Sequence, residues 1–241
     1  MIKLEGKEGN HPLLDNLRLP DKTKSIKFRS IQDMVSFFLG IFPKGFYDDE
    51  YLKDERGYKA EAHKHMLMLL DKTKLNNMIK SNNYDEICKN ALKVVNKTNL
   101  IFPHEKMGLT DGLKSKENRE HFAISLYDFL YGQREFSARF EIFAKCLEDI
   151  NASKWTTQTY FPFITFPEKY MFMKPTVTQS AADAFAFELN YRSEINWKSY
   201  ESLLKFSEYV AGELSKLDDY LKPRDMIDVQ SFVWCSVPGK Y

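Results

Sequence analysis

An arginine and a histidine with the chemistry to act on a phosphodiester lie seven residues apart in a predicted helix. They are Arg56 and His63, with Lys59 between them, and helical periodicity places all three side chains on one polar face. A histidine side chain titrates near neutral pH and can act as a general acid or base. An arginine can hold a phosphate through paired hydrogen bonds. Metal-independent cleavage of RNA is therefore one hypothesis, and a solvated helix face is the other interpretation.

The Arg-x6-His spacing resembles that of the HEPN ribonucleases, in which an arginine and a histidine on a helix cleave RNA without a metal ion. The resemblance implies catalytic roles for Arg56 and His63. The sequence departs from the family pattern at Gly57, because a polar residue usually follows the arginine in that family.

Two further groups of charged residues are candidates for lining a pocket. His104 and Glu105 lie in a segment interrupted by proline and glycine, and irregular segments often carry function. An ordinary helix start explains them equally well, and Gly108 excludes an HExxH zinc motif. The second group lies at the start of the last predicted helix: Arg224, Asp225 and Asp228. Carboxylates in a first helical turn suit the helix dipole; the alternative is a buried Asp–Arg or Asp–Lys pair facing a pocket.

The densest aromatic run, residues 155–174, is punctuated by lysines. Lysines beside aromatic rings are typical of a surface that binds single-stranded nucleic acid, where bases stack and ammonium groups meet phosphates. The competing interpretations are a buried core segment and a protein-binding patch. The candidate binding residues are Lys154, Trp155, Tyr160, Lys169, Tyr170 and Lys174. Both sides of this segment are apolar when it is drawn extended, so a small β-hairpin near 158–173 is plausible.

Outside that run, apolar residues recur at helical spacing. The sequence predicts a mainly α fold, a multi-helix globular bundle with at most a small β-hairpin near 158–173. The predicted organisation is an irregular N-terminal arm (1–27), a helical subdomain (28–150), and an aromatic extended segment with C-terminal helices packed on the first part (151–241). A single domain is the alternative.

Several helix boundaries carry recognisable signals. Ser30, Asp48 or Asp49, and Asn196 are expected to cap helices that extend to about 39, 70 and 217. Thr176 or Thr178 is expected to cap a helix that reaches about 189, and Pro223 to occupy the first position of the last helix. Residues 98–115 are expected to be irregular, and the remaining helices are expected over about 74–81, 84–96, 116–130 and 135–150.

Composition narrows the class of protein. The chain has 241 residues, 43% of them hydrophobic and 29% charged, which is typical of a globular protein rather than a disordered one. A net charge of +1 gives no global field toward DNA or an anionic membrane. The longest apolar run, 34–42, is too short to cross a bilayer, and the N-terminus has no signal-peptide core. The three isolated cysteines are expected to be free thiols in the cytoplasm.

We interpret the sequence as that of a non-enzymatic cytoplasmic binding protein that engages a protein partner or single-stranded nucleic acid through the aromatic-basic segment. We expect no cofactor, no metal and no membrane partner, because nucleotide-binding loops and Cys/His clusters are absent from the sequence. The alternatives are the HEPN-like ribonuclease and a structural helical subunit of a larger assembly, which would include a homo-oligomer.

Overall fold

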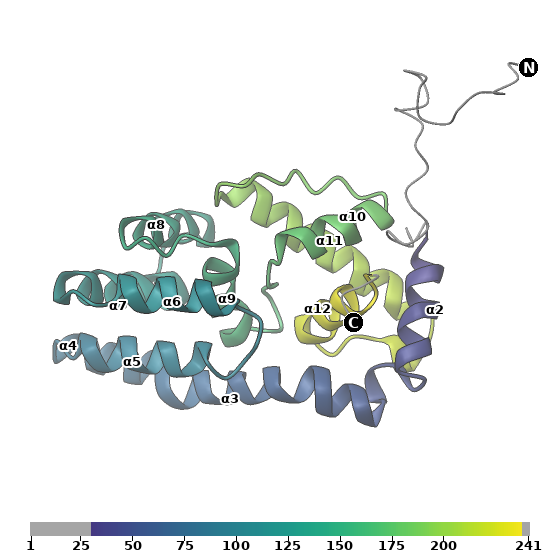
Figure 1. Ribbon diagram of the computed structural model, residues 1–241, viewed down its shortest axis with the longest axis horizontal. Coiled ribbons are helices and arrows are strands. Elements are labelled where there is room, and N and C mark those ends of the chain that lie inside the picture. The colour runs from purple at the N-terminus through teal and green to yellow at the C-terminus, as the bar shows by residue number, and fades with distance from the viewer. Residues whose placement is uncertain (1–29, 238–241) are drawn as a thin grey trace, which may run out of the picture.

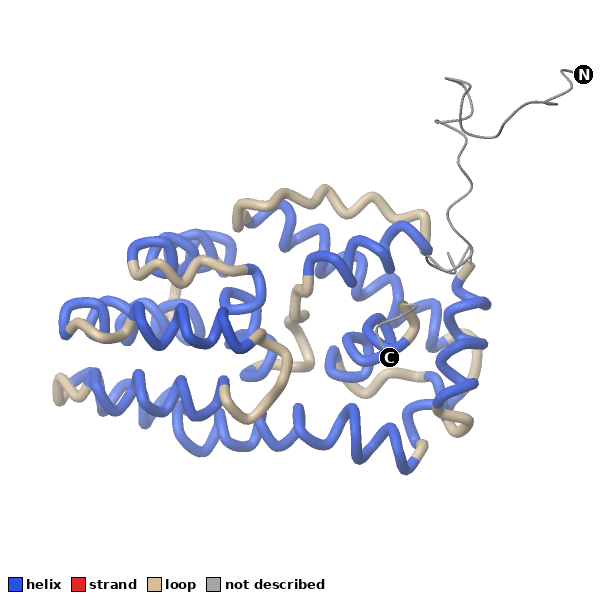
Figure 2. Tube along the Cα trace, viewed as in Figure 1, coloured by secondary structure: helices blue, strands red, loops and turns tan. Residues whose placement is uncertain are grey.

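Helices account for all the regular structure in residues 30–237, the part of the chain that the computed structural model describes. No strand occurs there, so the predicted mainly α fold is confirmed (Figures 1 and 2). The predicted N-terminal arm, 1–27, lies outside the described residues. The α-helices are α2 (Ile31–Ile41), α3 (Gly57–Leu70), α4 (Lys72–Lys80), α5 (Tyr84–Val95), α6 (Pro103–Gly112), α7 (Lys116–Tyr131), α8 (Phe136–Asp149), α9 (Trp155–Thr165), α10 (Pro175–Ala184), α11 (Trp197–Ser215) and α12 (Met226–Cys235).

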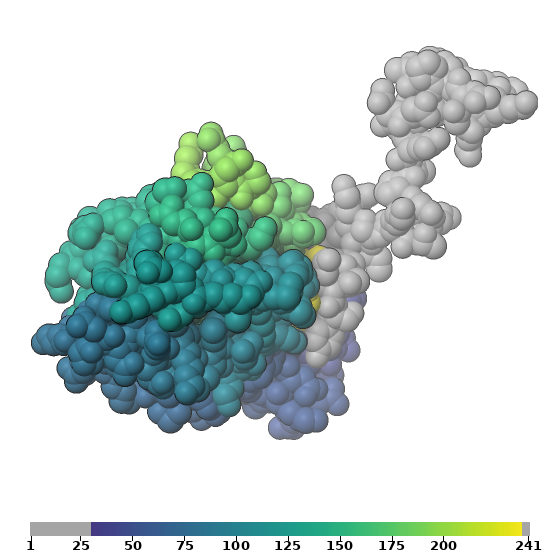
Figure 3. All heavy atoms as spheres, turned by 60° about the vertical axis from the view of Figure 1, so that its left-hand side comes forward, coloured from purple at the N-terminus to yellow at the C-terminus, as the bar shows by residue number. Residues whose placement is uncertain are grey.

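The helices form two groups that share one long element. At one end of the molecule α3, α5, α7 and α8 stack in successive layers, with α9 packed against α3, α7 and α8 (Figure 1). Figure 3 shows these layers on the surface as bands from blue to green. At the other end α10 and α11 pack on α12, and α12 packs on Tyr51–Arg56, the turn that precedes α3. The chain from Tyr51 to Leu70 therefore lies under both groups.

Local sequence signals set several helix starts. The side chain of Ser30 accepts a hydrogen bond from the Asp33 backbone, and that of Asn196 accepts one from the Ser199 backbone. Asp48 accepts one from the Glu50 backbone. These three predicted caps are confirmed, because each side chain satisfies an N–H group that the helix leaves unpaired.

The segment Tyr51–Arg56 is a π-helix that continues directly into α3. A Cβ at Gly57 would lie 2.9 Å from the carbonyl oxygen of Leu52, so the wider turn requires glycine there. The glycine that weakens the helical pattern of the sequence therefore marks the end of this π segment. Such segments interrupt α-helices and are frequent at functional sites.

The predicted hairpin near 158–173 is wrong, because residues 155–165 form helix α9. Every residue of α9 is buried. A helix that is buried on all sides has no polar face, so its sequence pattern looks the same as that of a strand buried on both sides. The hydroxyls of Thr159 and Thr165 donate to carbonyls one turn earlier, which makes these β-branched residues compatible with the helix. Residues 166–174 then form a turn and an irregular strap.

Three smaller predictions are also wrong. Residues 98–115 are expected from the sequence to be irregular but include α6. The side chain of Glu105 stabilises the start of this helix by accepting a hydrogen bond from the Phe102 backbone. Lys174 rather than a threonine precedes α10, which ends at Ala184. Asp225 caps α12, so Pro223 lies before that helix and not in its first turn.

Candidate functional site

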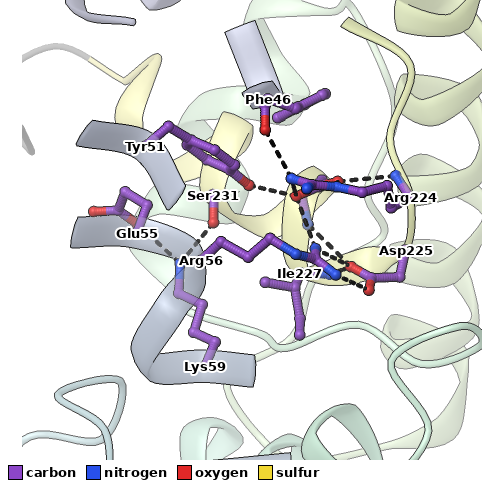
Figure 4. A network of polar contacts seen from close by, with 10 residues as sticks. Phe46, Tyr51, Glu55, Arg56, Lys59, Arg224, Asp225, Ile227 and Ser231 are labelled. Carbon is purple, nitrogen blue, oxygen red and sulfur yellow. Dashed lines mark hydrogen bonds and ion pairs between the residues drawn. The ribbon is translucent and has the colours of Figure 1, made fainter. Parts of the chain in front are cut away.

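The carboxylate of Asp228 lies at the centre of a network that joins the π segment to α12 (Figure 4). Its Oδ1 accepts hydrogen bonds from Tyr51 Oη at 2.6 Å, Arg56 Nη1 at 2.8 Å and Arg224 Nη2 at 3.0 Å. Its Oδ2 accepts from the Arg224 backbone at 2.9 Å and from Arg224 Nε at 2.8 Å. The Asp228 side chain is fully buried.

Two further ion pairs complete the network. Arg56 binds Asp225 through two parallel hydrogen bonds of 2.8 and 2.6 Å, the strongest geometry for this pair. Lys59, also fully buried, donates to Glu55 Oε2 at 2.9 Å and to Ser231 Oγ at 2.7 Å. The network thus holds three cations and three carboxylates, and its charges balance.

Burial and pairing set the protonation of this network. Burial alone would raise the pKa of Asp228, but the hydrogen bonds from Arg224 and Tyr51 and the charge of Arg56 outweigh it and leave that pKa lowered. Burial and the Asp228 carboxylate raise the pKa of Tyr51 well above its usual range. Burial lowers the pKa of Lys59 despite the opposing charge of Glu55. The arrangement keeps Asp228 ionised and Tyr51 neutral, and the guanidinium of Arg56 is bound on both sides by carboxylates.

The polar face predicted for Arg56, Lys59 and His63 is not solvated. Arg56 and Lys59 turn into the network, and His63 Nδ1 lies 2.7 Å from the carbonyl oxygen of Ile164 in α9. Because a carbonyl oxygen only accepts, Nδ1 of His63 must carry the proton. The structure therefore holds Arg56 with α12 and His63 with α9, and it unites Arg56 with two of the predicted pocket residues, Asp225 and Asp228.

The aromatic members of the predicted binding segment belong to the core. Trp155 is 5% exposed, and its Nε1 donates to the carbonyls of Arg192 and Ser193. Tyr160 is fully buried, and its hydroxyl donates to the Val94 carbonyl at 2.8 Å. Tyr170 is 5% exposed and stacks on Phe136, while Lys169 lies on the outside over the Tyr170 ring. These three rings do not form an exposed stacking surface.

Lys174 does meet partly exposed rings, but they come from other helices. Its Nζ lies 3.8 Å from the ring centre of Phe102 and 4.9 Å from that of Trp234, and it donates to the Leu100 carbonyl at 3.2 Å. A pocket of about 170 Å³ opens here, lined by Glu55, Tyr58, Asn99, Leu100, Phe102, Lys174, Gln230 and Trp234. We name it the Lys174 pocket. Sequence reasoning missed Phe102, Tyr58 and Trp234, because only the fold brings the starts of α3 and α6 beside the end of α12.

A second pocket is lined in part by Pro175, the residue that follows Lys174. It has a volume of about 450 Å³ and is lined by Glu105, Ser153, Lys154, Trp155, Thr156, Pro175, Tyr191, Ser193, Glu194 and Ile195. It unites Lys154, Trp155 and Glu105, which come from two different predicted sites. The exposed His104 stacks on Phe102 at 5.7 Å, so it lies beside the Lys174 pocket.

We found no protein-family model, curated protein or solved structure that matches this chain. Within residues 30–237, no group of three or more His, Cys, Asp or Glu side chains is arranged to hold a metal ion. In the same part of the chain, no helix is both long enough and apolar enough to cross a membrane.

Proposed function

We propose that this chain is a non-enzymatic binding protein for single-stranded nucleic acid and that the Lys174 pocket is its contact site. The observation that carries the proposal is the position of the Lys174 ammonium group against Phe102, which is 46% exposed, and the half-buried Trp234. Exposed or half-exposed rings next to a cation can stack on bases while the cation meets a phosphate. The aromatic-basic hypothesis thus keeps its lysine, but the rings come from the residue before α6 and from α12.

The starts of α9 and α10 both line the second pocket and favour an anionic ligand near them. Lys154 is the residue before α9 and Lys174 the residue before α10, and neither helix start has a side-chain cap. The free N–H groups at a helix N-terminus and the helix dipole both attract phosphate. Glu105 and Glu194 also line the pocket at Lys154, so we assign the principal phosphate contact to the Lys174 side.

Lysines on and just after α5 give the protein a basic surface, which supports binding of an anionic strand. Lys89 and Lys93 are exposed one turn apart on α5 and line a third pocket with Arg119, and the exposed Lys97 follows the end of the helix. Glu86 lies 3.8 Å from both Lys89 and Lys93 and offsets part of their charge. Residues 72–121 contain ten lysines and arginines against six acidic residues, so a basic region exists in a chain of net charge +1.

The cytoplasm is the proposed compartment. Cys88, Cys146 and Cys235 are buried free thiols. Burial raises the pKa of Cys88 to about 12 and that of Cys146 to about 11, so both stay protonated and unreactive at neutral pH. Unpaired cysteines of this kind are typical of a reducing compartment.

The test is a binding titration with a fluorescein-labelled single strand of 12 nucleotides and mixed sequence, followed by anisotropy at several salt concentrations. We expect affinity to fall as salt rises. We expect Lys174→Ala to weaken binding by roughly threefold to tenfold and to reduce the salt slope by about one. Lys205→Ala is the matched control, since Lys205 is exposed on α11 and forms a surface ion pair with Glu201. A strand that fails to bind, or that binds Lys174→Ala as well as wild type, contradicts the proposal; capture of a protein partner would then be the next experiment.

The ribonuclease alternative has less geometric support, because two carboxylates already bind the Arg56 guanidinium. Its test is incubation of RNA with the protein in EDTA, with His63→Ala alongside. Cleavage that disappears in the variant would favour catalysis over simple binding.

The assembly alternative is supported by exposed apolar residues on α3, where Leu67 and Met68 are 41% and 54% exposed. A stable dimer in sedimentation, together with no strand binding, would favour it.

A further inference from the structure

We propose that the Lys174 pocket holds one unstacked base and prefers a base that carries an exocyclic amino group, such as cytosine, over uracil. The inference rests on the proposed function, because it assigns base selectivity to the site where a single strand would bind. It is carried by two hydrogen-bond acceptors in the pocket wall, one of which is buried without a partner among the described residues.

The first acceptor is the amide oxygen of Gln230. The Gln230 side chain lines the pocket and is only 4% exposed, yet its Oε1 has no hydrogen-bond partner among the described residues. Buried polar atoms nearly always have a partner, so an exception calls for an explanation such as a missing ligand. A ligand group with an N–H at this position would supply the missing bond.

The second acceptor is the carboxylate of Glu55, which is 6% exposed and lines the same pocket. Its Oε2 accepts from Lys59, and Figure 4 shows the other oxygen turned away from the network. Among the described residues this Oε1 accepts no hydrogen bond, and a carboxylate paired with an ammonium group cannot itself donate. Both groups would therefore accept hydrogen bonds from donors on a ligand.

Pocket size and walls restrict which donor fits. Drug-sized ligands occupy about 300–1,000 Å³, whereas this pocket measures about 170 Å³ and admits one ring rather than a whole nucleotide cofactor. Tyr58, Phe102 and Trp234 provide aromatic walls for a flat ring, and Lys174 lies where the sugar–phosphate would leave the pocket. A single base is the group that combines a flat face with donors on its edge.

Cytosine and uracil provide the sharpest comparison. They have the same size, but cytosine presents a 4-amino donor where uracil presents a carbonyl oxygen. A carbonyl there would face the Glu55 carboxylate, which only accepts hydrogen bonds, and would leave the Gln230 oxygen without a donor. The pocket should therefore bind a cytosine-containing strand more tightly than a uracil-containing strand of the same length.

The experiment measures the affinities of fluorescein-labelled (dC)8 and (dU)8 for the full-length protein at pH 7.5 and fixed salt. We expect (dC)8 to bind about threefold to tenfold more tightly, as one or two net hydrogen bonds would give. Gln230→Leu should reduce this ratio toward one, while Gln133→Leu, at an exposed site between α7 and α8, should preserve it. Thermal unfolding by circular dichroism checks that both variants fold.

The outcomes separate the two proposals. Equal, salt-dependent binding of both strands by the wild type overturns base selectivity and leaves single-strand binding in place. Failure of both strands to bind overturns single-strand binding itself. The comparison of (dC)8 with (dU)8 uses the wild-type protein. It therefore tests base selectivity even if the Gln230→Leu variant folds poorly.

Discussion

The polar groups on the two sides of α12 differ in whether they have hydrogen-bond partners. On one side Asp228 accepts five hydrogen bonds from three residues, and Ser231 accepts one from Lys59. On the other side Gln230 and Trp234, one helical turn apart, face the Lys174 pocket, and the Gln230 amide oxygen is buried without a partner among the described residues. A single short helix thus has a polar network with every charge paired beside a pocket with an unused acceptor.

This contrast indicates that the charged network has a structural role and that the pocket has the binding role. A network whose charges are mutually satisfied has no free group for a ligand, and its contribution is to fix the π segment against α12. An unsatisfied acceptor costs stability in the free protein, and a ligand can recover that cost. Glu55 belongs to both sides, since it pairs with Lys59 and also lines the pocket. The network therefore positions one wall of the pocket.

The largest expected effect is on the network side. Asp228→Asn keeps the shape of the side chain but leaves Arg56 and Arg224 without their shared carboxylate. Removing one partner of a buried ion pair costs about 3–5 kcal/mol, and we expect a loss of that size in the free energy of unfolding measured by urea denaturation. Asp54→Asn is the control, because Asp54 is half exposed and its pair with Lys53 should contribute at most about 1 kcal/mol. Equal effects of the two substitutions would refute the structural role of the network.

A smaller effect is expected at the buried Lys59–Glu55 pair. Lys59→Met removes the ammonium group that pairs with Glu55, and the carboxylate left without this partner should cost about 1–3 kcal/mol of the free energy of unfolding. Adding Glu55→Leu to make the double variant should recover much of that loss, because an apolar pair of similar volume often replaces a buried ion pair without cost. Urea denaturation of both single variants and the double variant measures the coupling. Additive losses would show that the pair does not act as a unit.

The acid limb of the stability curve provides a third comparison. Hydrogen bonds from Arg224 and Tyr51, with the charge of Arg56, hold the pKa of Asp228 below its unfolded value of about 3.9. The corresponding stabilisation is therefore complete above that unfolded pKa and is lost as pH falls through the folded pKa. We expect the stability gap between wild type and Asp228→Asn to narrow between pH 5 and pH 2 in urea titrations. A gap independent of pH would mean that the carboxylate charge contributes nothing.

Local signals explain why much of the fold could be predicted. Ser30 and Asn196 cap helices through bonds three residues away, and such short-range chemistry is readable in one sequence. The helical period also identified the layers formed by α5, α7 and α8. The same method failed at α9, because a segment buried on every side carries no period that distinguishes helix from strand.

The candidate site could be predicted only in fragments, since its residues meet across long stretches of chain. Arg56 and Asp225 were singled out separately as a catalytic residue and a pocket residue, and 169 positions separate them in the sequence. Lys174 was identified from its aromatic neighbours in sequence, whereas the rings that it contacts are Phe102 and Trp234. Residue types indicate chemistry, but only packing decides which of them share a site.

The smallest expected effect lies on the pocket side and has the opposite sign. Gln230→Leu replaces a buried amide whose oxygen is unpaired with an apolar group of similar size, so the desolvation cost of that oxygen disappears. We expect the free energy of unfolding to stay unchanged or to rise by up to about 1 kcal/mol, since removing an unsatisfied polar group is often neutral or stabilising. Urea denaturation under the conditions used for Asp228→Asn gives the comparison directly. A loss of more than about 1 kcal/mol would mean that Gln230 is satisfied in the folded protein, and both the contrast between the two sides of α12 and the proposed base-selective pocket would then lose their main support.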